Sequence, residues 1–424
     1  MQTSLLGIAN KASSNRSYRF RNLFGELTCE HLTHCWKKIN QKAAAGVDQM
    51  TARRYGRNLT ANLQNLVDSV KSQSYRSKWI RRKYIPKPNG KLRPLGIPAI
   101  ADKVLQAGAS TILQAIYEHG EFLPSSYGYR PARSTSDAVK DLTRTLQTGQ
   151  FHYIVEADIR GFFDNIDHDI LLAMLAKRID DQAFLELIRR WLKAPIQEPD
   201  GSVNIPTKGS PQGGIISPVL SNIYLHEALD SWFHDVVKPW CRGKAQIWRY
   251  ADDFVAAFEN GEDAQAFYRV LGKRLKKYEL ELAPEKTRCL RFSRYDRKQN
   301  ESFDFLGFSI RWGKSLKGYP CIKKRTSSKK FRAALVEVKK WIGENYWHPK
   351  KVWFPILAAK LRGHYQYYGV RGNYERISDF AYQIKTAVFK KLNRRSQRRS
   401  YNWTEFNELW AHYNLPKPRI CHDF

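Results

Sequence analysis

Two adjacent aspartates stand in an apolar stretch of this chain. Asp252 and Asp253 lie in the sequence WRYADDFV, residues 248–255, with aromatic and aliphatic residues on both sides. Two neighbouring carboxylates repel each other, and a buried position for them requires a metal or another cation. The alternative is a solvated acidic pair in an ordinary turn. Because the flanking residues predict two core strands, we favour a cation-binding turn at the tip of a strand pair.

A second acidic segment, EADIRGFFDNIDHD at residues 156–169, supplies a third carboxylate. Asp158 ends an apolar run that predicts a strand, so its side chain is expected to project over a sheet edge. The separation of 94 positions between Asp158 and Asp252 allows two neighbouring strands with helices between them. Three carboxylates that converge on Mg²⁺ suit a two-metal site for nucleotidyl transfer. Helix capping explains the acids that follow in the turn and helix start, which are Asp164, Asp167 and Asp169.

Helical and strand patterns are mixed around these acids. The segment 80–98, which contains a P-N-G-K turn, predicts a hairpin, and residues 245–259 predict strand, turn and strand. Strands are also expected over 151–158 and 303–310, and helices within 28–70 (interrupted near Gly46), 102–118, 168–179, 217–233 and 263–280. The two kinds of element do not alternate regularly, so we predict an α+β fold with an antiparallel sheet.

The composition indicates a polyanionic partner. The chain has 424 residues, with 72 Lys and Arg against 40 Asp and Glu and a formal net charge of +32. Nucleic acid is the first candidate for that partner. No apolar run is long enough for a membrane helix, the N-terminus lacks the apolar core of a secretory signal, and the six cysteines are scattered like reduced thiols. We expect a cytoplasmic protein with no membrane partner.

The positive charge is concentrated towards the end of the chain. Residues 311–424 hold 26 Lys and Arg against 7 Asp and Glu, and Gly and Pro turn signals occur near 311–320. We therefore predict one domain over 1–315 and a basic helical domain over 316–424. Four arginines in the cluster RRSQRR repel one another unless a polyanion is present, which predicts RNA binding by Arg394, Arg395, Arg398 and Arg399. Three aromatic residues at helical spacing are expected in the core of this domain: Trp341, Tyr365 and Tyr368.

The order of the motifs resembles reverse transcriptases, and among them those encoded by bacterial group II introns. VEADIRGFFD, SPQGGIISPVLSNIYL, RYADDF, ELELAPEKTRCLRF and FDFLGF resemble segments of their palm. KAAAGVDQMT, IPKPNGKLRPLGIP and SYGYRPARST resemble their fingers, and LRGHYQYYGV resembles the thumb or maturase domain. The resemblance implies a right-hand polymerase fold, with fingers and palm in 1–315 and the thumb in 316–424. It also implies an RNA-directed DNA polymerase that binds intron RNA as a splicing maturase in retrohoming.

The resemblance also assigns roles to single residues. Two Mg²⁺ ions, for which Mn²⁺ can substitute, are expected on Asp158, Ile159, Asp252 and Asp253, with the three aspartates catalytic. Asp252 is the stronger candidate to bridge both ions, and Asp253 acts from the edge. The expected nucleotide-binding residues are Lys87, Arg93, Phe163, Gln212 and Ala251. The expected contacts to template, primer or RNA, besides the four arginines, are Arg130, Gly213, Gly214, Tyr250 and Lys286.

Several of these residues have purely structural alternatives. Phe163 is expected to exclude a ribose 2′-hydroxyl, but it could be a core aromatic, a role for which Phe162 is the better candidate. Gly213 and Gly214 suit a tight turn as well as a close backbone approach to a base pair. Arg93 is preferred over its lysine neighbours for a triphosphate because a guanidinium binds phosphate in a bidentate manner. For Lys286 the alternative is a surface lysine.

The resemblance has a limit at the end of the chain. Many relatives carry an H-N-H endonuclease with clustered His and Cys, and only His412, Cys421 and His422 occur here. We therefore expect the endonuclease-lacking type, with an RNA template, a DNA primer or target, and dNTPs as partners. Two alternatives stay open: a splicing-only maturase, against which the intact site residues argue, and a host-adopted enzyme in DNA repair or phage defence. The sequence leaves the cognate RNA and the oligomeric state undetermined.

Overall fold

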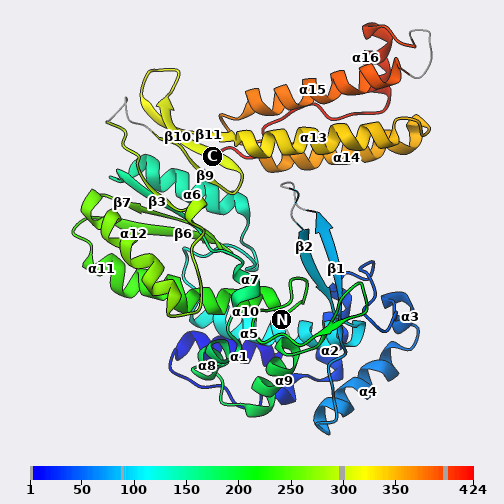
Figure 1. Cartoon of the computed structure of the whole chain (residues 1–424), viewed down its shortest axis with the longest axis vertical. Helices are drawn as coiled ribbons and strands as arrows, with labels where there is room; N and C mark the ends of the chain where they lie inside the picture. The colour runs from blue at the N-terminus through cyan, green and yellow to red at the C-terminus, as the bar shows by residue number, and fades with distance from the viewer. Residues whose placement is uncertain (1–2, 87–89, 91, 296–300, 395–399) are drawn as a thin grey trace. The chain divides into compact units, whose positions relative to one another are not determined.

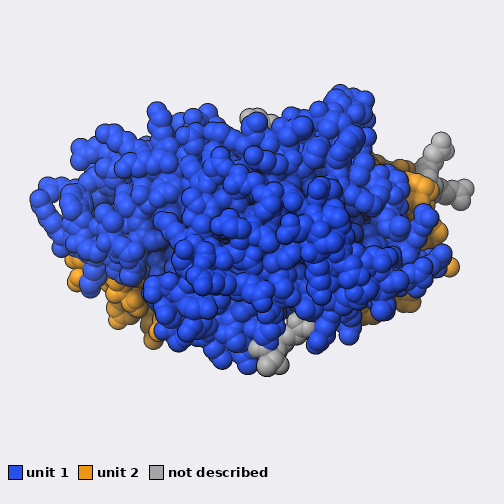
Figure 2. All heavy atoms as spheres, turned by 90° about the horizontal axis from the view of Figure 1, so that it is seen from below, with its two compact units in different colours: residues 1–133, 157–256, 262–288 blue, residues 134–156, 257–261, 289–424 orange. Residues whose placement is uncertain are grey.

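The chain combines helices and strands in two compact units (Figure 1). This computed structural model describes residues 3–86, 90, 92–295, 301–394 and 400–424. Unit 1 consists of residues 1–133, 157–256 and 262–288, and unit 2 consists of 134–156, 257–261 and 289–424; Figure 2 colours them separately. The irregular order of the elements and the antiparallel strand pairs confirm the predicted α+β class.

The expected boundary at residue 315 is not a limit of either unit. It falls in the turn between β10 (Phe308–Lys314) and β11 (Pro320–Thr326), and both strands belong to unit 2. The Gly and Pro signals in this segment therefore mark a hairpin turn. Seven residue pairs hold the hairpin together, from Phe308 opposite Thr326 to Lys314 opposite Pro320.

A long buried helix organises the helical part of unit 1. Helix α5 (Ile100–Gly120) is buried along most of its length because small and apolar residues occupy nearly all of its faces. It contacts α1 (Thr3–Ser14) and α2 (Cys29–Lys38), and α2 in turn contacts α4 (Leu59–Lys71). Two short helical segments, η1 (Phe24–Glu26) and α3 (Ala52–Gly56), complete this part. The interruption predicted near Gly46 is present, and a Cβ on Gly46 would lie 2.6 Å from Ala99 Cα.

The predicted hairpin over 80–98 is also present. β1 (Ile80–Pro86) pairs antiparallel with β2 (Leu92–Ile97), and Ile85 lies opposite Arg93. The sheet continues with β4 (Ile196–Gln197) and β5 (Val203–Asn204) in the order β2-β1-β4-β5. This register places Arg93 on an exposed part of β2.

A second four-stranded sheet carries the acidic residues. Its strands are β3 (Tyr153–Asp158), β6 (Ala245–Tyr250), β7 (Asp253–Phe258) and β8 (Arg288–Arg291), in the order β6-β7-β3-β8. Three of these strands run across the division between the units, and the ends that carry the acids lie in unit 1. β7 lies between β6 and β3, and His152 N, just before β3, donates to Phe258 O at the end of β7 at 2.9 Å. The turn after β6 is therefore a neighbour of the end of β3.

Helices connect these strands. They are α7 (Phe162–Asn165), α8 (His168–Ala176), α9 (Gln182–Leu192), α10 (Ser217–Leu225), α11 (Lys238–Trp240), α12 (Gly261–Lys276) and the 3-10 turn η4 (Pro284–Lys286). Asp167 caps α8, accepting bonds of 3.0 Å from the amides of Asp169 and Ile170, as predicted. The helix predicted over 217–233 differs in kind, because α10 passes into the π segments η2 (His226–Asp230) and η3 (Phe233–Val237). A 3.6-residue pattern cannot reveal such an insertion.

Unit 2 joins a small sheet to a helical core. The sheet has the order β11-β10-β9, and the strand predicted over 303–310 is split into β9 (Phe303–Phe305) and β10 by a turn with positive φ at Leu306 and Gly307. Its helices are α6 (Thr135–Thr148), α13 (Ser328–Asn345), α14 (Lys350–Tyr368), α15 (Tyr374–Leu392) and α16 (Trp403–His412). Tyr365 is buried in the core, and Trp341 and Tyr368 pack against it, as predicted. Within the described residues, no helix is both long and apolar enough to span a membrane.

Candidate active site

The turn between β6 and β7 carries the paired aspartates. Tyr250 ends β6, Asp253 begins β7, and Ala251 between them has a left-handed φ of 57°. Non-glycine residues adopt this conformation only where the surroundings impose it. Here Gly128 lies against the turn so closely that a Cβ on it would be 2.4 Å from Ala251 N. The Ala251 side chain is buried, so we leave it out of the nucleotide contacts that we propose.

Asp252 and Asp158 come together at neighbouring strand ends. Burial raises the pKa of the Asp252 carboxyl above its usual value, and the charge of Asp158 raises it further. Lys286 and Arg93 act in the opposite direction through their positive charges. The structure therefore assembles four of the predicted residues at one place. Asp253 follows directly in the chain and is half-buried.

Lys286 provides a positive charge in direct contact with this acidic pair. It ends the 3-10 turn η4, and its ammonium group donates a hydrogen bond to Asp158 Oδ2, which raises the lysine pKa. The backbone supports the same arrangement, because Ala283 N donates to Asp158 O at 2.8 Å. Ile159 pairs with Leu282 in an antiparallel bridge alongside. Lys286 thus acts as the counter-ion of Asp158 in this structure.

The donor set suits a divalent ion after a small rearrangement. In the part of the chain that the structure describes, no three His, Cys, Asp or Glu side chains are arranged closely enough to hold a metal. One oxygen of Asp158 is engaged by Lys286. Two carboxylates that interact electrostatically in a partly buried place are nevertheless the oxygen ligands that Mg²⁺ prefers. Metal binding would require the Lys286 ammonium group to leave Asp158.

Two aromatic residues follow the end of β3 and occupy different environments. Phe162 is 2% exposed and its ring contacts Tyr224, so it is the core aromatic of the pair. Phe163 is only half-buried, and its ring lies edge-on to Tyr129 at 6.3 Å between centroids. Tyr129 is 45% exposed, and burial together with the charge of Asp252 raises its pKa. Sequence reasoning missed Tyr129, although its aromatic type beside Arg130 was an available signal.

Arg130 has a different place from the one predicted. Its side chain is buried and forms a bidentate pair with the Glu118 carboxylate through Nε and Nη2. Nη1 donates to the carbonyl oxygens of Leu123 and Ser126 at 2.6 and 2.9 Å. A guanidinium engaged in this way stabilises the loop and is not available to a template or nucleotide. The prediction for Arg130 as such a contact is therefore wrong.

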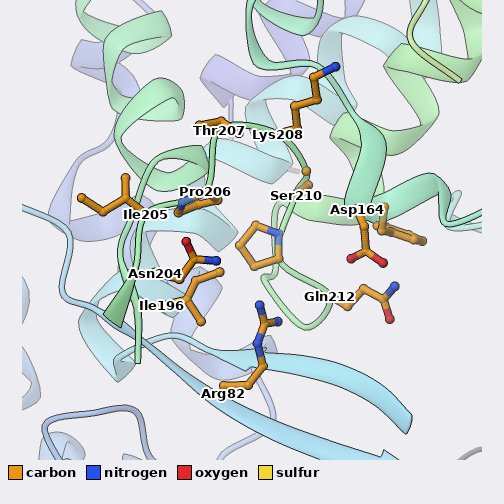
Figure 3. A pocket seen from close by; sticks show the side chains of 13 residues that line it. Arg82, Asp164, Ile196, Asn204, Ile205, Pro206, Thr207, Lys208, Ser210 and Gln212 are labelled. Carbon is orange, nitrogen blue, oxygen red and sulfur yellow. The ribbon is translucent and has the colours of Figure 1, made fainter. Parts of the chain in front are cut away.

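A pocket of about 330 Å³ lies beside Phe163 (Figure 3). The loop 204–212 lines one part of it, Arg82 from β1 and Asp164 from α7 line others, and the Gln212 side chain lies at its edge. Ser210 Oγ is buried at this pocket and has no hydrogen-bond partner within the described residues. Gln212 is thus placed next to Phe163 with an open space in front of it.

The two glycines after Gln212 have local packing reasons. Gly213 has a φ of 114°, and a Cβ on it would lie 2.6 Å from Gly96 O. Gly96 N in turn donates to Gln212 O at 2.7 Å, which fixes the loop against β2. A Cβ on Gly214 would lie 2.8 Å from Ser217 Oγ at the start of α10. These contacts support the tight-turn alternative for both glycines.

Comparison with known proteins assigns the chain to a family. Residues 85–310 match the model of "Reverse transcriptase (RNA-dependent DNA polymerase)", which is more than half of the chain. The chain belongs to the reverse transcriptase family. It is 30% identical to the group II intron-encoded protein LtrA of Lactococcus lactis subsp. cremoris over 413 residues, 78% of this chain and 67% of that protein.

Two further relatives agree with this assignment. Protein YkfC of Escherichia coli is 37% identical over 193 residues, 45% of this chain and 50% of that protein. An uncharacterized 91 kDa protein in the cob intron of Schizosaccharomyces pombe is 36% identical over 174 residues, 41% of this chain and 21% of that protein. The reverse transcriptase described here is therefore an RNA-directed DNA polymerase and maturase of the group II intron type, which confirms the resemblance seen in its motifs.

Five predicted site residues of this reverse transcriptase lie either outside the described residues or in unit 2. Lys87, Arg395, Arg398 and Arg399 lie outside the described residues. Arg394 is described and is an exposed residue of unit 2. The acidic turn, Phe163, Gln212 and Arg93 all belong to unit 1.

The raised pKa of Asp252 leads to a prediction for the metal-free reverse transcriptase. A carboxyl whose pKa is raised by folding destabilises the native state once it ionises, so stability is lost as pH rises through that pKa. We expect Asp252→Asn to raise the melting temperature at pH 7 by on the order of 2 °C. The gain should shrink as pH falls through the raised pKa of Asp252, because the protonated carboxyl carries no charge. Scanning calorimetry in EDTA measures both effects.

A matched control is available for this measurement. The Asp169 side chain is 82% exposed, so Asp169→Asn removes the same charge without relieving a buried one. It should leave the melting temperature nearly unchanged. An Asp252→Asn protein that melts at or below the wild-type temperature at pH 7 would contradict the electrostatic description of the site.

Proposed function

We propose that this reverse transcriptase extends a DNA primer with dNTPs on an RNA template at Asp158, Asp252 and Asp253. The observation that supports this site most directly is the electrostatic coupling of Asp158 and Asp252 at neighbouring strand ends. Two partly buried carboxylates destabilise the protein unless a cation neutralises their charge. The six unpaired cysteines agree with a reducing compartment, and we propose the cytoplasm.

The resident cofactor in this proposal is Mg²⁺, as two ions, with Mn²⁺ able to substitute. Asp158 and Asp252 would hold the ions, assisted by Asp253 and the carbonyl group of Ile159. When bound, the metal lowers the pKa of the primer 3′-hydroxyl and offsets the charge of the leaving pyrophosphate. Lys286 keeps Asp158 neutralised before that stage, and Tyr250, half-buried at the end of β6, is our candidate for a primer contact.

The incoming nucleotide would lie against β2 and the loop that carries Gln212. Arg93 is exposed, and its positive charge acts on Asp252, which suits a ligand of the triphosphate. Gln212 and Phe163 both line the neighbouring pocket. In this proposal the Phe163 ring excludes a ribose 2′-hydroxyl, and Tyr129 packs against its edge.

Primer extension tests the catalytic assignment. With an RNA template, a DNA primer, dNTPs and Mg²⁺, the wild-type protein should extend the primer. Asp252→Asn should lower the rate by at least about a thousandfold, because the ligand loses its charge, while template–primer affinity stays within about twofold. Asp169→Asn serves as the control and should extend normally. Template–primer binding without any extension by the wild-type protein would refute this function and favour a binding-only maturase.

Substitution of Phe163 tests the nucleotide site separately. Phe163→Ala should permit rNTP incorporation and lower discrimination against rNTPs by about ten- to a hundredfold, because the steric barrier is removed. Single-nucleotide kinetics with dATP and ATP measure this ratio. Phe162→Leu, in the adjacent core position, is the control and should keep the wild-type ratio. A Phe163→Ala enzyme that still rejects rNTPs would remove this residue from the site.

We further propose that unit 2 binds the intron RNA along a basic groove. The groove, of about 440 Å³, lies along α13 and α15, which contact each other (Figure 1). Its cationic residues are Lys339, Lys390, Lys391 and Arg394, and none of the described residues that line it is acidic. Lys391 lies over the Tyr346 ring at 5.3 Å, and Lys339 bonds Gln383, so these contacts leave the positive charge uncompensated. Such a set of cations suits RNA phosphates.

The salt dependence of RNA binding tests the groove. Lys339→Ala with Lys390→Ala removes two cations and should weaken RNA binding, with the slope of log affinity against log salt concentration smaller by about 1 to 2. Lys314→Ala with Lys317→Ala removes the same charge from exposed positions at the β10–β11 hairpin and is the matched control. Equal losses of affinity in the two double variants would contradict a role for the groove beyond overall charge.

A further inference from the structure

A fully buried arginine supports the turn with the paired aspartates. Arg249 lies in β6, three residues before Asp252, and its side chain has no exposed surface. Its partner Asp230 is equally buried. A charged guanidinium is costly to bury unless a counter-ion and hydrogen-bond acceptors surround it. This buried ion pair lies directly beside the turn with the paired aspartates, which suggests that it serves the site.

Every donor of the Arg249 guanidinium has an acceptor. A guanidinium has five N–H donors. Nε and Nη2 bind the two oxygens of Asp230 at 2.7 and 2.5 Å, and Nη2 also donates to Ser126 Oγ at 2.8 Å. Nη1 donates to Asn222 Oδ1 at 3.1 Å and to the carbonyl oxygen of Ala251 at 3.0 Å. Five bonds to four different segments therefore define one orientation of this side chain.

We propose that Arg249 is the positioning residue of Asp252. The bond to Ala251 O fixes the peptide group between Ala251 and Asp252, and thereby the direction in which the Asp252 side chain leaves the turn. Ala251 needs such a restraint because its φ of 57° is unfavourable for alanine. The proposal rests on the proposed function, in which Asp252 is catalytic. Arg249 itself acts through the turn and touches no substrate.

The loop 125–128 completes this support from the other side. It pairs with β6 through two backbone bonds, Arg249 N to Ser125 O at 2.9 Å and Tyr127 N to Arg249 O at 2.8 Å. Asn222 Nδ2 donates to Gly128 O at 2.7 Å, so the residue that accepts from Arg249 also fixes this loop. Gly128 then contacts Ala251, where no side chain would fit. The turn is held by the guanidinium and by this loop together.

The π segment after α10 places two of the guanidinium's partners, Asn222 and Asp230, on one face. Asn222 and Asp230 are eight residues apart, whereas an α-helix returns to about the same face after seven. The segment η2 (His226–Asp230) adopts the wider π geometry, which takes up the extra residue. Asn222 and Asp230 can then bind the same guanidinium. This gives the irregular helix a function in the positioning of the turn.

Arg249→Lys tests the proposal because lysine keeps the charge but cannot make the five bonds. We expect the single-turnover rate of nucleotide addition to fall by about a hundredfold, as for a displaced catalytic group. The dissociation constants of template–primer and dNTP should change by less than about threefold, since Arg249 touches neither ligand. Arg178→Lys is the matched control, because Arg178 is also buried and paired with a carboxylate, Glu121, away from the turn. It should lower the melting temperature comparably and leave the rate unchanged.

The outcomes separate this proposal from the function on which it rests. A wild-type protein that binds template–primer but does not extend it would refute the proposed function. A wild-type protein that extends, with a folded Arg249→Lys variant that extends at the same rate, would refute only the positioning role. If Arg249→Lys does not fold, Asn222→Ala removes one acceptor and the tie to Gly128. A folded Asn222→Ala protein should be slower by about tenfold with unchanged ligand affinities, and an unchanged rate would overturn the proposal.

Discussion

The electrostatic repulsion between Asp158 and Asp252 is the main physical constraint on this site. The two carboxylates are held at neighbouring strand ends, and burial together with the charge of Asp158 raises the pKa of the Asp252 carboxyl. The strand order β6-β7-β3, with the start of β3 bonded to the end of β7 through His152 N and Phe258 O, places the turn after β6 beside the end of β3. A protein that maintains such an arrangement needs both a rigid frame and a source of positive charge.

The frame and the charge come from different residues. The rigid frame is the buried network of Arg249, Asp230 and Asn222, which reaches the carbonyl group of Ala251. The positive charge comes from Lys286, whose ammonium group donates a hydrogen bond to Asp158 while the lysine side chain stays 56% exposed. An exposed lysine can move away at small cost, whereas a buried ion pair cannot. This division explains how a site can keep its geometry and exchange its cation.

Much of this fold and part of the site could be predicted from the sequence. The hairpin over 80–98, the strand that ends at Asp158 and the cap at Asp167 follow from local patterns, which depend on residues adjacent in the chain. Among several nearby acids, the sequence pattern favoured Asp158, because only Asp158 ends an apolar strand. In the structure the charge of Asp158 acts on Asp252. The resemblance of the motifs then gave the family, which residues 85–310 confirm.

The remainder depended on contacts that the sequence does not show. Arg130 looked like a free cation, but Glu118, on the preceding helix, occupies its guanidinium. Arg249 gave no signal in the sequence, because its hydrogen-bond partners Asp230 and Ser126 lie 19 and 123 residues before it in the chain. The close approach of Gly213 to Gly96 likewise appears only when the loop and β2 are in place.

In our proposal, Asp158 and Asp252 are held together in order to bind a divalent cation. The most direct test is the melting temperature of the wild-type protein during a Mg²⁺ titration, compared with Asp252→Asn at the same ionic strength. A ligand that binds only the native state stabilises it. At concentrations above the dissociation constant, this stabilisation grows with the logarithm of the ligand concentration. We predict a melting temperature that keeps rising with the logarithm of the Mg²⁺ concentration for the wild-type protein, and a much smaller rise for Asp252→Asn. Equal rises in the two proteins would contradict the account.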